Sequence, residues 1–362
     1  MKILIDISQI VYGTGVSVYT RNLVESLLNI DKENDYTLFG GTLRRREEIQ
    51  LFFKQLNKYD FDGRIAPIPP SLANILWNRL HVIKIENFVG KADVFHSSDW
   101  SQPPSGAFKV TTVHDLIPIK YPMLSHAKLI STHLERFRWV KKEVDRVIVP
   151  SKASAEDLEK LGVGLERIRV IHEAPDPRIK RSSSSKIERI KRKYRITGKY
   201  LLSIGLTPRK NTERIIEAYE KIKVETKLKL VILGYPYMDF HPTRGVLTVG
   251  HVPFSELADF HSGAEALIYP SLYEGFGLPI LEAMICKTPV VTSNLGSMAE
   301  VGEKAAVLVD PYDVNSIAEG VLEAIRNKEK YIKLGLEHVR KFSWEKSARE
   351  TLGVYKEALD LK

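Results

Sequence analysis

The chain has 362 residues, of which 43% are hydrophobic and 27% are charged, so disordered, collagen-like and low-complexity classes are excluded. Its apolar runs are far shorter than the roughly 20 residues of a membrane-spanning helix, and its first residues lack the pattern of a signal peptide. The single cysteine, Cys286, excludes a disulfide framework. We expect a cytoplasmic protein that is large enough for two domains.

The net charge of +9 is concentrated in one segment. Residues 178–195 hold nine Lys or Arg and one Glu, and the rest of the chain is close to neutral. A solvated linker with an exposed helix explains this segment most simply, and a patch that meets anionic lipid head groups is the alternative. Nucleic acid is not expected as a partner, because no recognition motif accompanies the charge.

Short β-rich apolar runs alternate with helical patterns along the whole chain, which is typical of parallel sheets with crossover helices. We therefore predict an α/β fold with two Rossmann-like, doubly wound domains. The expected strands of the first domain are 2–7, 36–39, 64–68, 93–96, 109–113, 146–149 and 169–171. Those of the second domain are 200–204, 229–233, 247–249, 266–269, 289–292 and 306–309.

The break between the two series of strands is marked by a Pro-rich turn at 174–177 and a serine tract at 182–185. We expect an N-terminal domain at 1–176, a basic linker at 177–198 and a C-terminal domain at 199–342. A helix over 343–362, capped by Ser343, is expected to join the N-terminal domain as a brace. Its apolar stripe has helical spacing and consists of Trp344, Ala348, Leu352, Tyr355 and Leu359.

Two loops of the first domain carry candidate binding residues. The loop after the first strand contains Gly13 and Gly15 and is similar to a dinucleotide fingerprint, but Val18 stands at the third glycine position. We therefore exclude NAD and expect a loop that lets a phosphate or a sugar approach the backbone. His114 follows another strand and is expected on the same edge of the sheet.

Two loops of the second domain carry the densest chemistry. Arg209 and Lys210 follow its first strand, and two adjacent cations at a strand end suit a diphosphate. The segment 269–282 joins a strand to a helix, with Glu274 in the loop and Glu282 about one turn into the helix. Glycines between the two glutamates let a ligand approach backbone N–H groups. We expect both carboxylates to face a crevice at the carboxyl edge of the sheet.

Together these motifs resemble those of the retaining nucleotide-sugar glycosyltransferases of family 4, which have the GT-B fold. Glu274 and Glu282 match the two glutamates of the family, which are separated by seven residues, and 208–211 resembles its diphosphate-binding loop. His114, Gly13 and Gly15 match the histidine and the glycine loop of its first domain.

The chain departs from the family pattern at three places. The separate arginine that follows a glycine in the family is absent after Gly205, which leaves Arg209 to do its work alone. Family members often have an Asn-Gly pair near the position of His172 and Glu173, and often a glycine at the position of Lys287. These departures concern details of the donor contacts rather than the class of protein.

The resemblance implies a transferase that moves a hexosyl group from a GDP- or UDP-hexose to a saccharide or lipid-linked acceptor, with the site in a cleft between the domains. Cell-envelope polysaccharide or glycoconjugate synthesis is the expected context. The residues implied as catalytic are His114, Arg209, Lys210 and Glu274. The residues implied in donor binding are Gly13, Gly15, Gly205, His251, Val252, Gly275, Phe276, Gly277, Leu278 and Glu282.

No metal or other cofactor is expected. The only Asp-x-Asp pair, Asp60 and Asp62, lies in a polar stretch and is interpreted as a solvated loop. Arg209, Lys210 and a helix N-terminus near Leu278 can instead offset the charge of a diphosphate. Retention of the anomeric configuration follows from the family resemblance alone.

Two other functions remain open at this point: a nucleotide-sugar epimerase, which shares the two-domain fold, and a non-catalytic sensor of nucleotides or sugars. Peripheral contact with an anionic membrane is a further expectation. It is based on the predicted helix 128–144, which has an apolar side and a cationic side with Arg136, Arg138, Lys141 and Lys142.

Overall fold

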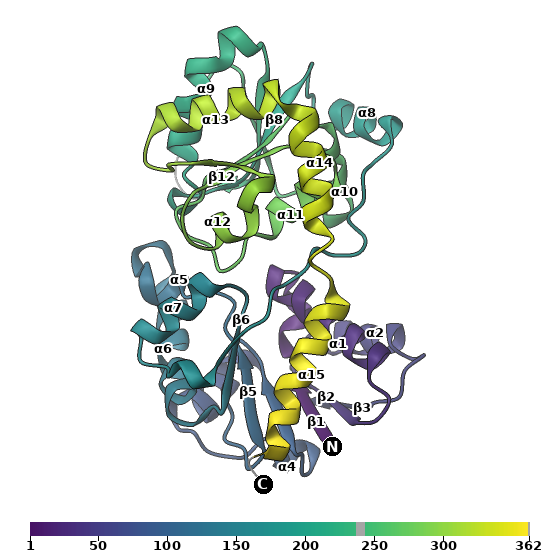
Figure 1. Cartoon of the computed structure of the whole chain (residues 1–362). Coiled ribbons are helices and arrows are strands. Elements are labelled where there is room, and N and C mark those ends of the chain that lie inside the picture. Colours follow the sequence, from purple (N-terminus) through teal and green to yellow (C-terminus); the bar gives the residue numbers. More distant parts are fainter. Residues whose placement is uncertain (237–242, 361–362) are drawn as a thin grey trace. The chain divides into compact units, whose positions relative to one another are not determined.

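The computed structural model describes residues 1–236 and 243–360, and the chain forms two compact units (Figure 1). Unit 1 comprises Met1–Glu173 and the segment that begins at Ser343, and unit 2 comprises Ala174–Phe342. Residues 177–198, which we expected to form a linker, lie within unit 2. There the helix α8 (Ser184–Lys193) packs on α10 (Phe254–Gly263) and buries Ile190 completely.

Unit 1 is built on a seven-stranded parallel sheet in the order β3-β2-β1-β4-β5-β6-β7. The chain moves outward in one direction from β1 and in the other from β4. The carboxyl ends of these two neighbours therefore form a switch point, where doubly wound sheets bind ligands. The strands are β1 (Lys2–Asp6), β2 (Asp35–Gly41), β3 (Asp62–Ala66), β4 (Val94–Ser97), β5 (Phe108–Thr112), β6 (Arg146–Val149) and β7 (Ile168–Val170).

The connections of unit 1 are helices and short helical turns. The α-helices are α1 (Gly15–Ile30), α2 (Arg46–Gln55), α3 (Pro70–Ala73), α4 (Glu86–Val89), α5 (Ile117–Lys120), α6 (Ala127–Glu143), α7 (Lys152–Lys160) and α15 (Trp344–Asp360). Three turns are 3₁₀-helical, η1 (Ser8–Tyr12), η3 (Pro122–Leu124) and η4 (Leu165–Arg167), and η2 (Asn74–Arg79) is a π-helix.

Unit 2 repeats the plan with a six-stranded parallel sheet in the order β10-β9-β8-β11-β12-β13, so its switch point lies between β8 and β11. The strands are β8 (Tyr200–Leu206), β9 (Lys229–Pro236), β10 (Val246–Gly250), β11 (Leu267–Tyr269), β12 (Val290–Ser293) and β13 (Val307–Val309). Besides α8 and α10, the helical segments are η5 (Pro208–Lys210), α9 (Thr212–Thr226), α11 (Leu278–Ile285), α12 (Gly296–Gly302), η6 (Glu303–Ala305), α13 (Val314–Arg326) and α14 (Lys328–Val339).

Both faces of the unit 2 sheet are buried, because alternate residues of each strand point to opposite faces. Leu201 and Leu230 share one hydrophobic cluster with residues of α9 and α13. Leu202 and Val231 share the other with residues of α10 and α11. Strands buried on both sides are rich in apolar residues, which makes them recognisable in the sequence. Every predicted strand is confirmed, and most ends agree within two residues.

The last helix, α15, belongs to unit 1 and packs on α1. Ser343 caps it as predicted, since its hydroxyl accepts a hydrogen bond from the backbone N–H of Lys346 at 3.2 Å. Trp344 and Tyr355 are buried as expected, but Leu359 is 54% exposed. Because the helix has 3.6 residues per turn, steps of four residues rotate gradually around its axis, and Leu359 lies outside the buried face.

The prediction that the cations of α6 all lie on its solvent side is wrong for Arg136, which is only 2% exposed. Its guanidinium donates to Thr111 Oγ1 at 2.6 Å and lies 3.5 Å from the carboxylate of Asp99, so the buried charge is compensated. Of the four cations that were predicted on this side, Arg138, Lys141 and Lys142 are exposed.

Candidate active site

The loops that follow β8 and β11 meet at the switch point of unit 2. Arg209 and Lys210 lie on η5 after β8, and Glu274 lies in the loop after β11. Glu274 Oε1 is 2.5 Å from Arg209 Nη1 and 2.6 Å from Lys210 Nζ. The structure therefore brings together three of the four residues that the sequence suggested as catalytic.

The Glu274 carboxylate is held in its ionised form by the two cations. Its side chain is 12% exposed. Burial by itself raises the pKa of Glu274, but the positive charges of Lys210 and Arg209 outweigh burial and lower this pKa to about 2. One negative and two positive side chains thus leave the cluster with a net positive charge, which suits a phosphate group.

Main-chain contacts fix the two loops against each other. The backbone N–H of Leu272 donates to the carbonyl of Arg209 at 2.9 Å, and Arg209 Nη1 donates to the carbonyl of Tyr273 at 2.7 Å. Ser297 Oγ donates to the carbonyl of Glu274 at 2.7 Å. The charged groups are therefore positioned before any ligand arrives, which is the condition for electrostatic catalysis.

Asn211 is the C-cap residue of η5, and its side chain holds the loops around the charged cluster together. Its φ of +63° lies in the left-handed region, which asparagine tolerates better than most residues. The residue is 3% exposed, and its side-chain amide donates to the carbonyls of Pro270 at 3.2 Å and Pro311 at 2.6 Å. Three loops are tied together through one amide group.

Two of the predicted donor glycines are required by the backbone. Gly205 has φ +96°, and a Cβ atom there would lie 2.6 Å from Cγ of Lys210. Gly277 has φ +119° and is the N-cap residue of α11. Side chains at either position would be strained, and at Gly205 a side chain would also displace one of the two cations.

The segment from Gly275 to Leu278 leads into α11 and presents backbone N–H groups at a helix N-terminus. The side chain of Phe276 is buried in the core and packs edge-on against Phe342, with 5.9 Å between ring centroids. Glu282 lies in the second turn of α11 and is 7% exposed. Its carboxylate is 3.7 Å from Nε2 of His261 on α10.

Two aromatic rings stack at the carboxyl ends of β9 and β10. His251 follows β10 and is exposed, and its ring lies 6.4 Å from that of Tyr235 at an angle of 14°. Tyr235 is 74% exposed. Val252, predicted beside His251, is buried in the hydrophobic core, so its side chain does not reach solvent. The sequence analysis missed Tyr235, which lies two residues beyond the predicted strand 229–233.

His114 lies in unit 1, after β5, and is paired with a residue that the sequence analysis did not assign to the site. Its Nδ1 is 2.8 Å from Oε1 of Glu173, and both side chains are at most 10% exposed. The ring of Tyr19 contacts the imidazole edge-on at 4.4 Å. Burial lowers the pKa of His114, but the hydrogen bond and charge of Glu173, helped by Asp99 and Asp115, outweigh it and raise this pKa.

The glycine loop of unit 1 follows η1, at the carboxyl end of β1. Gly13 has φ +66°, and α1 begins at Gly15 with a capping box formed by Thr14 and Ser17. Cβ atoms at Gly13 or Gly15 would meet nothing within 4 Å, so only Gly13 is required by the backbone. Gly13, Gly15 and His114 share the carboxyl edge of the unit 1 sheet, and the remaining predicted residues lie in unit 2.

The structure shows the surroundings of two of the departures from the family pattern, Lys287 and Glu173. Lys287 has φ +60°, the left-handed region that favours glycine, which accounts for the glycine expected there. Glu173, near the position of the expected Asn-Gly pair, supplies the carboxylate that contacts His114. The carboxylate of Glu173 at this position was the one signal in the sequence that could have revealed its pairing with His114.

Within residues 1–236 and 243–360, no three His, Cys, Asp or Glu side chains converge as a metal site requires. Asp62 is the first residue of β3 rather than part of a loop, and its carboxylate pairs with Arg64 at 2.8 Å. Asp60 is exposed and precedes the strand. None of the helices in the described part of the chain is long and apolar enough to cross a membrane.

The amino-acid sequence is similar to those of known glycosyltransferases over most of its length. The E. coli O-antigen chain mannosyltransferase B is 27% identical over 98% of this chain and 100% of its own length. The D-inositol 3-phosphate glycosyltransferase of Paenarthrobacter aurescens is 26% identical over 80% of this chain and 79% of its own.

Among solved structures, Anabaena HepE in complex with UDP and glucose superposes with a TM-score of 0.69 at 15% identity, covering 99% of this chain and 100% of its own. Sucrose-phosphate synthase from Thermosynechococcus elongatus gives 0.73 at 18% identity, with complete coverage of both chains. Residues 13–178 match the model of glycosyltransferase family 4, and residues 186–337 match the model of glycosyl transferases group 1. The chain therefore belongs to the family 4 glycosyltransferases and is a glycosyltransferase of the GT-B type.

Proposed function

We propose that this glycosyltransferase moves a hexosyl group from a nucleotide-diphosphate sugar to a saccharide or lipid-linked acceptor, with retention of configuration and without a metal ion. The observation that carries the proposal is the preorganised cluster of Arg209, Lys210 and Glu274 at the switch point of unit 2. Such a cluster offers fixed positive charge beside a carboxylate that can accept hydrogen bonds from sugar hydroxyls.

Each chemical group of the donor has a proposed binding partner in unit 2. Arg209 and Lys210 bind the diphosphate, and the backbone N–H groups from Gly275 onward hold the sugar together with Glu274. Glu282 accepts hydrogen bonds from the ribose hydroxyls, since an ionised carboxylate is an acceptor only. The exposed rings of His251 and Tyr235 offer a stacking surface for the base.

The same cations explain why no metal is proposed. A departing diphosphate develops negative charge, which Arg209, Lys210 and the N-terminus of α11 offset without reorganisation. Transfer should therefore proceed in the presence of EDTA, and activity that is lost with EDTA and restored by Mg²⁺ or Mn²⁺ would contradict this part of the proposal.

Retention requires that the acceptor oxygen attack the face from which the diphosphate departs. An oxygen of the departing phosphate takes the acceptor proton as the new glycosidic bond forms, so no protein nucleophile is needed. His114, oriented through Nδ1 by Glu173, is proposed to hydrogen-bond a sugar hydroxyl through its other ring nitrogen. An α-linked product from an α-linked donor, detected by NMR, supports retention, and a β-linked product refutes it.

The relatives suggest where to look for substrates. Several of them are named mannosyltransferases, including O-antigen and serotype-specific enzymes of E. coli. A solved structure with the same fold is described as a complex with UDP-glucose. We propose polysaccharide synthesis of the cell envelope as the context, with GDP-mannose as the first donor to test and UDP-glucose as the second.

One experiment tests the proposal against its alternatives. The protein is incubated with GDP-mannose or UDP-glucose, with and without mannotriose or an envelope glycolipid extract. A transferase forms a glycosylated acceptor, and an epimerase releases a changed sugar without any acceptor. A sensor binds nucleotide but turns over neither donor.

We further propose peripheral contact with an anionic membrane through α6. Its exposed cations Arg138, Lys141 and Lys142 lie on the same helix as Leu134, which is 50% exposed, and Met123 just before it is 89% exposed. Exposed apolar side chains beside cations suit the interface of a bilayer that contains anionic lipids.

A further inference from the structure

A buried histidine of unit 2 lies behind the carboxylate that was assigned above to the ribose of the donor. His261 is in the last turn of α10, and Glu282 is in the second turn of α11. The Nε2 atom of His261 is 3.7 Å from Oε2 of Glu282. The side chain of Glu282 is 10% exposed, whereas that of His261 is 0% exposed. A ligand can therefore reach Glu282, and His261 can act on a ligand only through Glu282.

The histidine interrupts a hydrophobic cluster. Its chain neighbour Phe260 belongs to this cluster, together with Ile280, Leu281 and Ala283 of α11. Neither ring nitrogen of His261 finds a hydrogen-bond partner within the described part of the chain. Because a buried polar atom without a partner lowers the stability of the fold, an apolar side chain would suit this position better. The imidazole therefore points to a role in binding rather than in stability.

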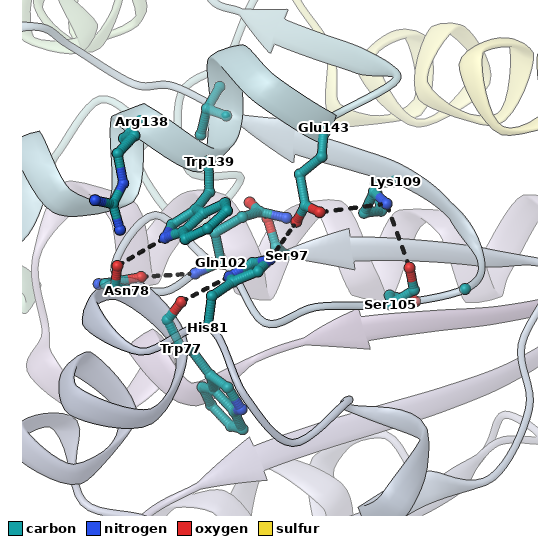
Figure 2. Close-up of polar contacts among 12 residues, drawn as sticks. Trp77, Asn78, His81, Ser97, Gln102, Ser105, Lys109, Arg138, Trp139 and Glu143 are labelled. Carbon is teal, nitrogen blue, oxygen red and sulfur yellow. Dashed lines mark hydrogen bonds and ion pairs between the residues drawn. The ribbon is translucent and has the colours of Figure 1, made fainter.

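Other histidines with little exposure are fixed by partners. Both ring nitrogens of His96 contact hydroxyl groups at hydrogen-bond distance. Figure 2 shows His81, whose Nδ1 is 2.9 Å from the carbonyl oxygen of Trp77 and whose Nε2 is 3.0 Å from the carboxylate of Glu143. His261 differs from them, because its Nε2 faces a carboxylate at a distance longer than a hydrogen bond.

A small shift of one side chain is enough to form that hydrogen bond. Since N–H···O distances are about 2.7–3.2 Å, the shift would be less than about 1 Å. Hydrogen bonds of catalytic sites are often long before substrate binds and shorten in the complex. The backbone of His261 is held in place, because its carbonyl accepts the hydroxyl of Thr288 at 2.5 Å. The more exposed carboxylate of Glu282 is therefore expected to move toward the imidazole.

We propose that His261 is a positioning residue of the donor site. When a nucleotide binds, Nε2–H of His261 donates to Oε2 of Glu282, since a carboxylate can only accept. This hydrogen bond fixes the plane of the carboxylate and leaves Oε1 to accept the ribose hydroxyls. Binding groups need such support from the residues behind them. The proposal rests on the proposed function, from which it takes the assignment of Glu282 to the ribose.

The test compares the binding of GDP and UDP with that of their 2′,3′-dideoxy forms by isothermal titration calorimetry. In the wild type, the loss of both hydroxyls should weaken binding about tenfold or more, because hydrogen bonds to a charged group are lost. His261→Phe keeps a ring and removes the N–H. It should weaken binding of the ribonucleotide about three- to tenfold and change that of the dideoxy form by less than about twofold.

Two further variants and a control identify the N–H as the cause. His261→Gln restores an N–H and should keep most of the wild-type ratio between the two affinities. Glu282→Gln should lower this ratio, and adding His261→Phe to it should lower the ratio little further, as expected for two residues of one contact. His338→Phe is the matched control and should leave the ratio unchanged. His338 is also a buried histidine of unit 2, but its Nε2 is 2.8 Å from the carbonyl oxygen of Val301.

The ratio separates positioning from a merely structural role, because a distorted unit 2 would bind both forms less well. Equal weakening of both forms in His261→Phe, unchanged binding of both, or a ratio that His261→Gln does not keep overturns the proposal. If His261→Phe does not fold, His261→Leu replaces it. A ratio that falls as expected supports the proposal even if no sugar is transferred. Transfer with an unchanged ratio overturns it and leaves the transferase standing. Failure of both GDP and UDP to bind refutes the donor assignment, and this proposal with it.

Discussion

Glu274→Gln removes the negative charge between Arg209 and Lys210 and preserves the size of the side chain. The pKa of Glu274 falls from 4.5 to about 2 in the folded chain, because Lys210 and Arg209 offset its burial. At about 1.4 kcal/mol for each pH unit, the ionised carboxylate stabilises unit 2 by about 3 kcal/mol at pH 7. This agrees with the roughly 3–5 kcal/mol that is lost when one partner of a buried ion pair is removed.

The stability lost in Glu274→Gln should be largest near neutral pH and should decrease in acid. Because the folded pKa is lowered, the stabilisation is present above pH 4.5 and disappears as the pH falls toward 2. The unfolding free energies of the wild type and of Glu274→Gln should therefore converge in acid. Tryptophan fluorescence reports only on unit 1, so unit 2 is followed by hydrogen exchange of the β8 and β11 peptides in increasing urea.

Glu188→Gln is the control for this prediction. Glu188 pairs with Lys191 at 2.9 Å on α8 of the same unit, but its side chain is 60% exposed. Its replacement should change the stability by less than about 1 kcal/mol. Equal stability of Glu274→Gln and the wild type at pH 7, or a difference that persists undiminished near pH 2, would refute the charge argument.

Three further outcomes are expected. Arg209→Ala or Lys210→Ala should lower kcat by about two to four powers of ten while unit 2 stays folded, and near-normal turnover would show that the pair is only surface charge. Glu173→Gln should lower the pKa of His114, measured by NMR, because burial remains and the carboxylate that raised this pKa is gone; an unchanged pKa would dismiss Glu173 as the cause. The protein should sediment with anionic vesicles at low salt and not at high salt, and absence of binding at low salt removes the membrane proposal.

The fold could be predicted because each strand and the loop that follows it can be recognised from residues that are neighbours in the sequence. Most buried parallel strands are short runs rich in apolar residues, and the loops that follow β8 and β11 carry their cations, glycines and carboxylates within a few residues of the strand ends. The parallel order of the sheet then brings the ends of neighbouring strands together. Arg209 and Glu274, which are far apart in the sequence, therefore meet as the motifs predicted.

The missed features depend on contacts between distant residues. Arg136 sits among cations in a helical pattern, and only Asp99 and Thr111, from other elements, explain its burial. The pair of His114 and Glu173 joins residues 59 positions apart, and no local periodicity reports it.

Unit 1 also has a pocket, lined in part by Gln9, Tyr12 and Trp100, that could not be predicted from the sequence for the same reason. Its lining comes from loops after four strands and from η2 and the start of α6, so its residues share no local pattern. The hydrogen bond from the side-chain amide of Asn78 to the carbonyl of Trp100 could not be predicted either, because it forms only when the segments 74–79 and 98–102 lie side by side in the fold.

The central claim is that the chain moves a sugar from a nucleotide diphosphate onto an acceptor. The most direct measurement is the stoichiometry of the reaction with EDTA present, with GDP-mannose or UDP-glucose as donor and mannotriose or an envelope glycolipid extract as acceptor. Released nucleoside diphosphate and new glycosidic product are quantified together. The account predicts one nucleoside diphosphate for each glycosidic bond, with turnover that depends on the acceptor and is lost in Arg209→Ala. Release of nucleoside diphosphate with only free or epimerised sugar, at a rate independent of any acceptor, would contradict it.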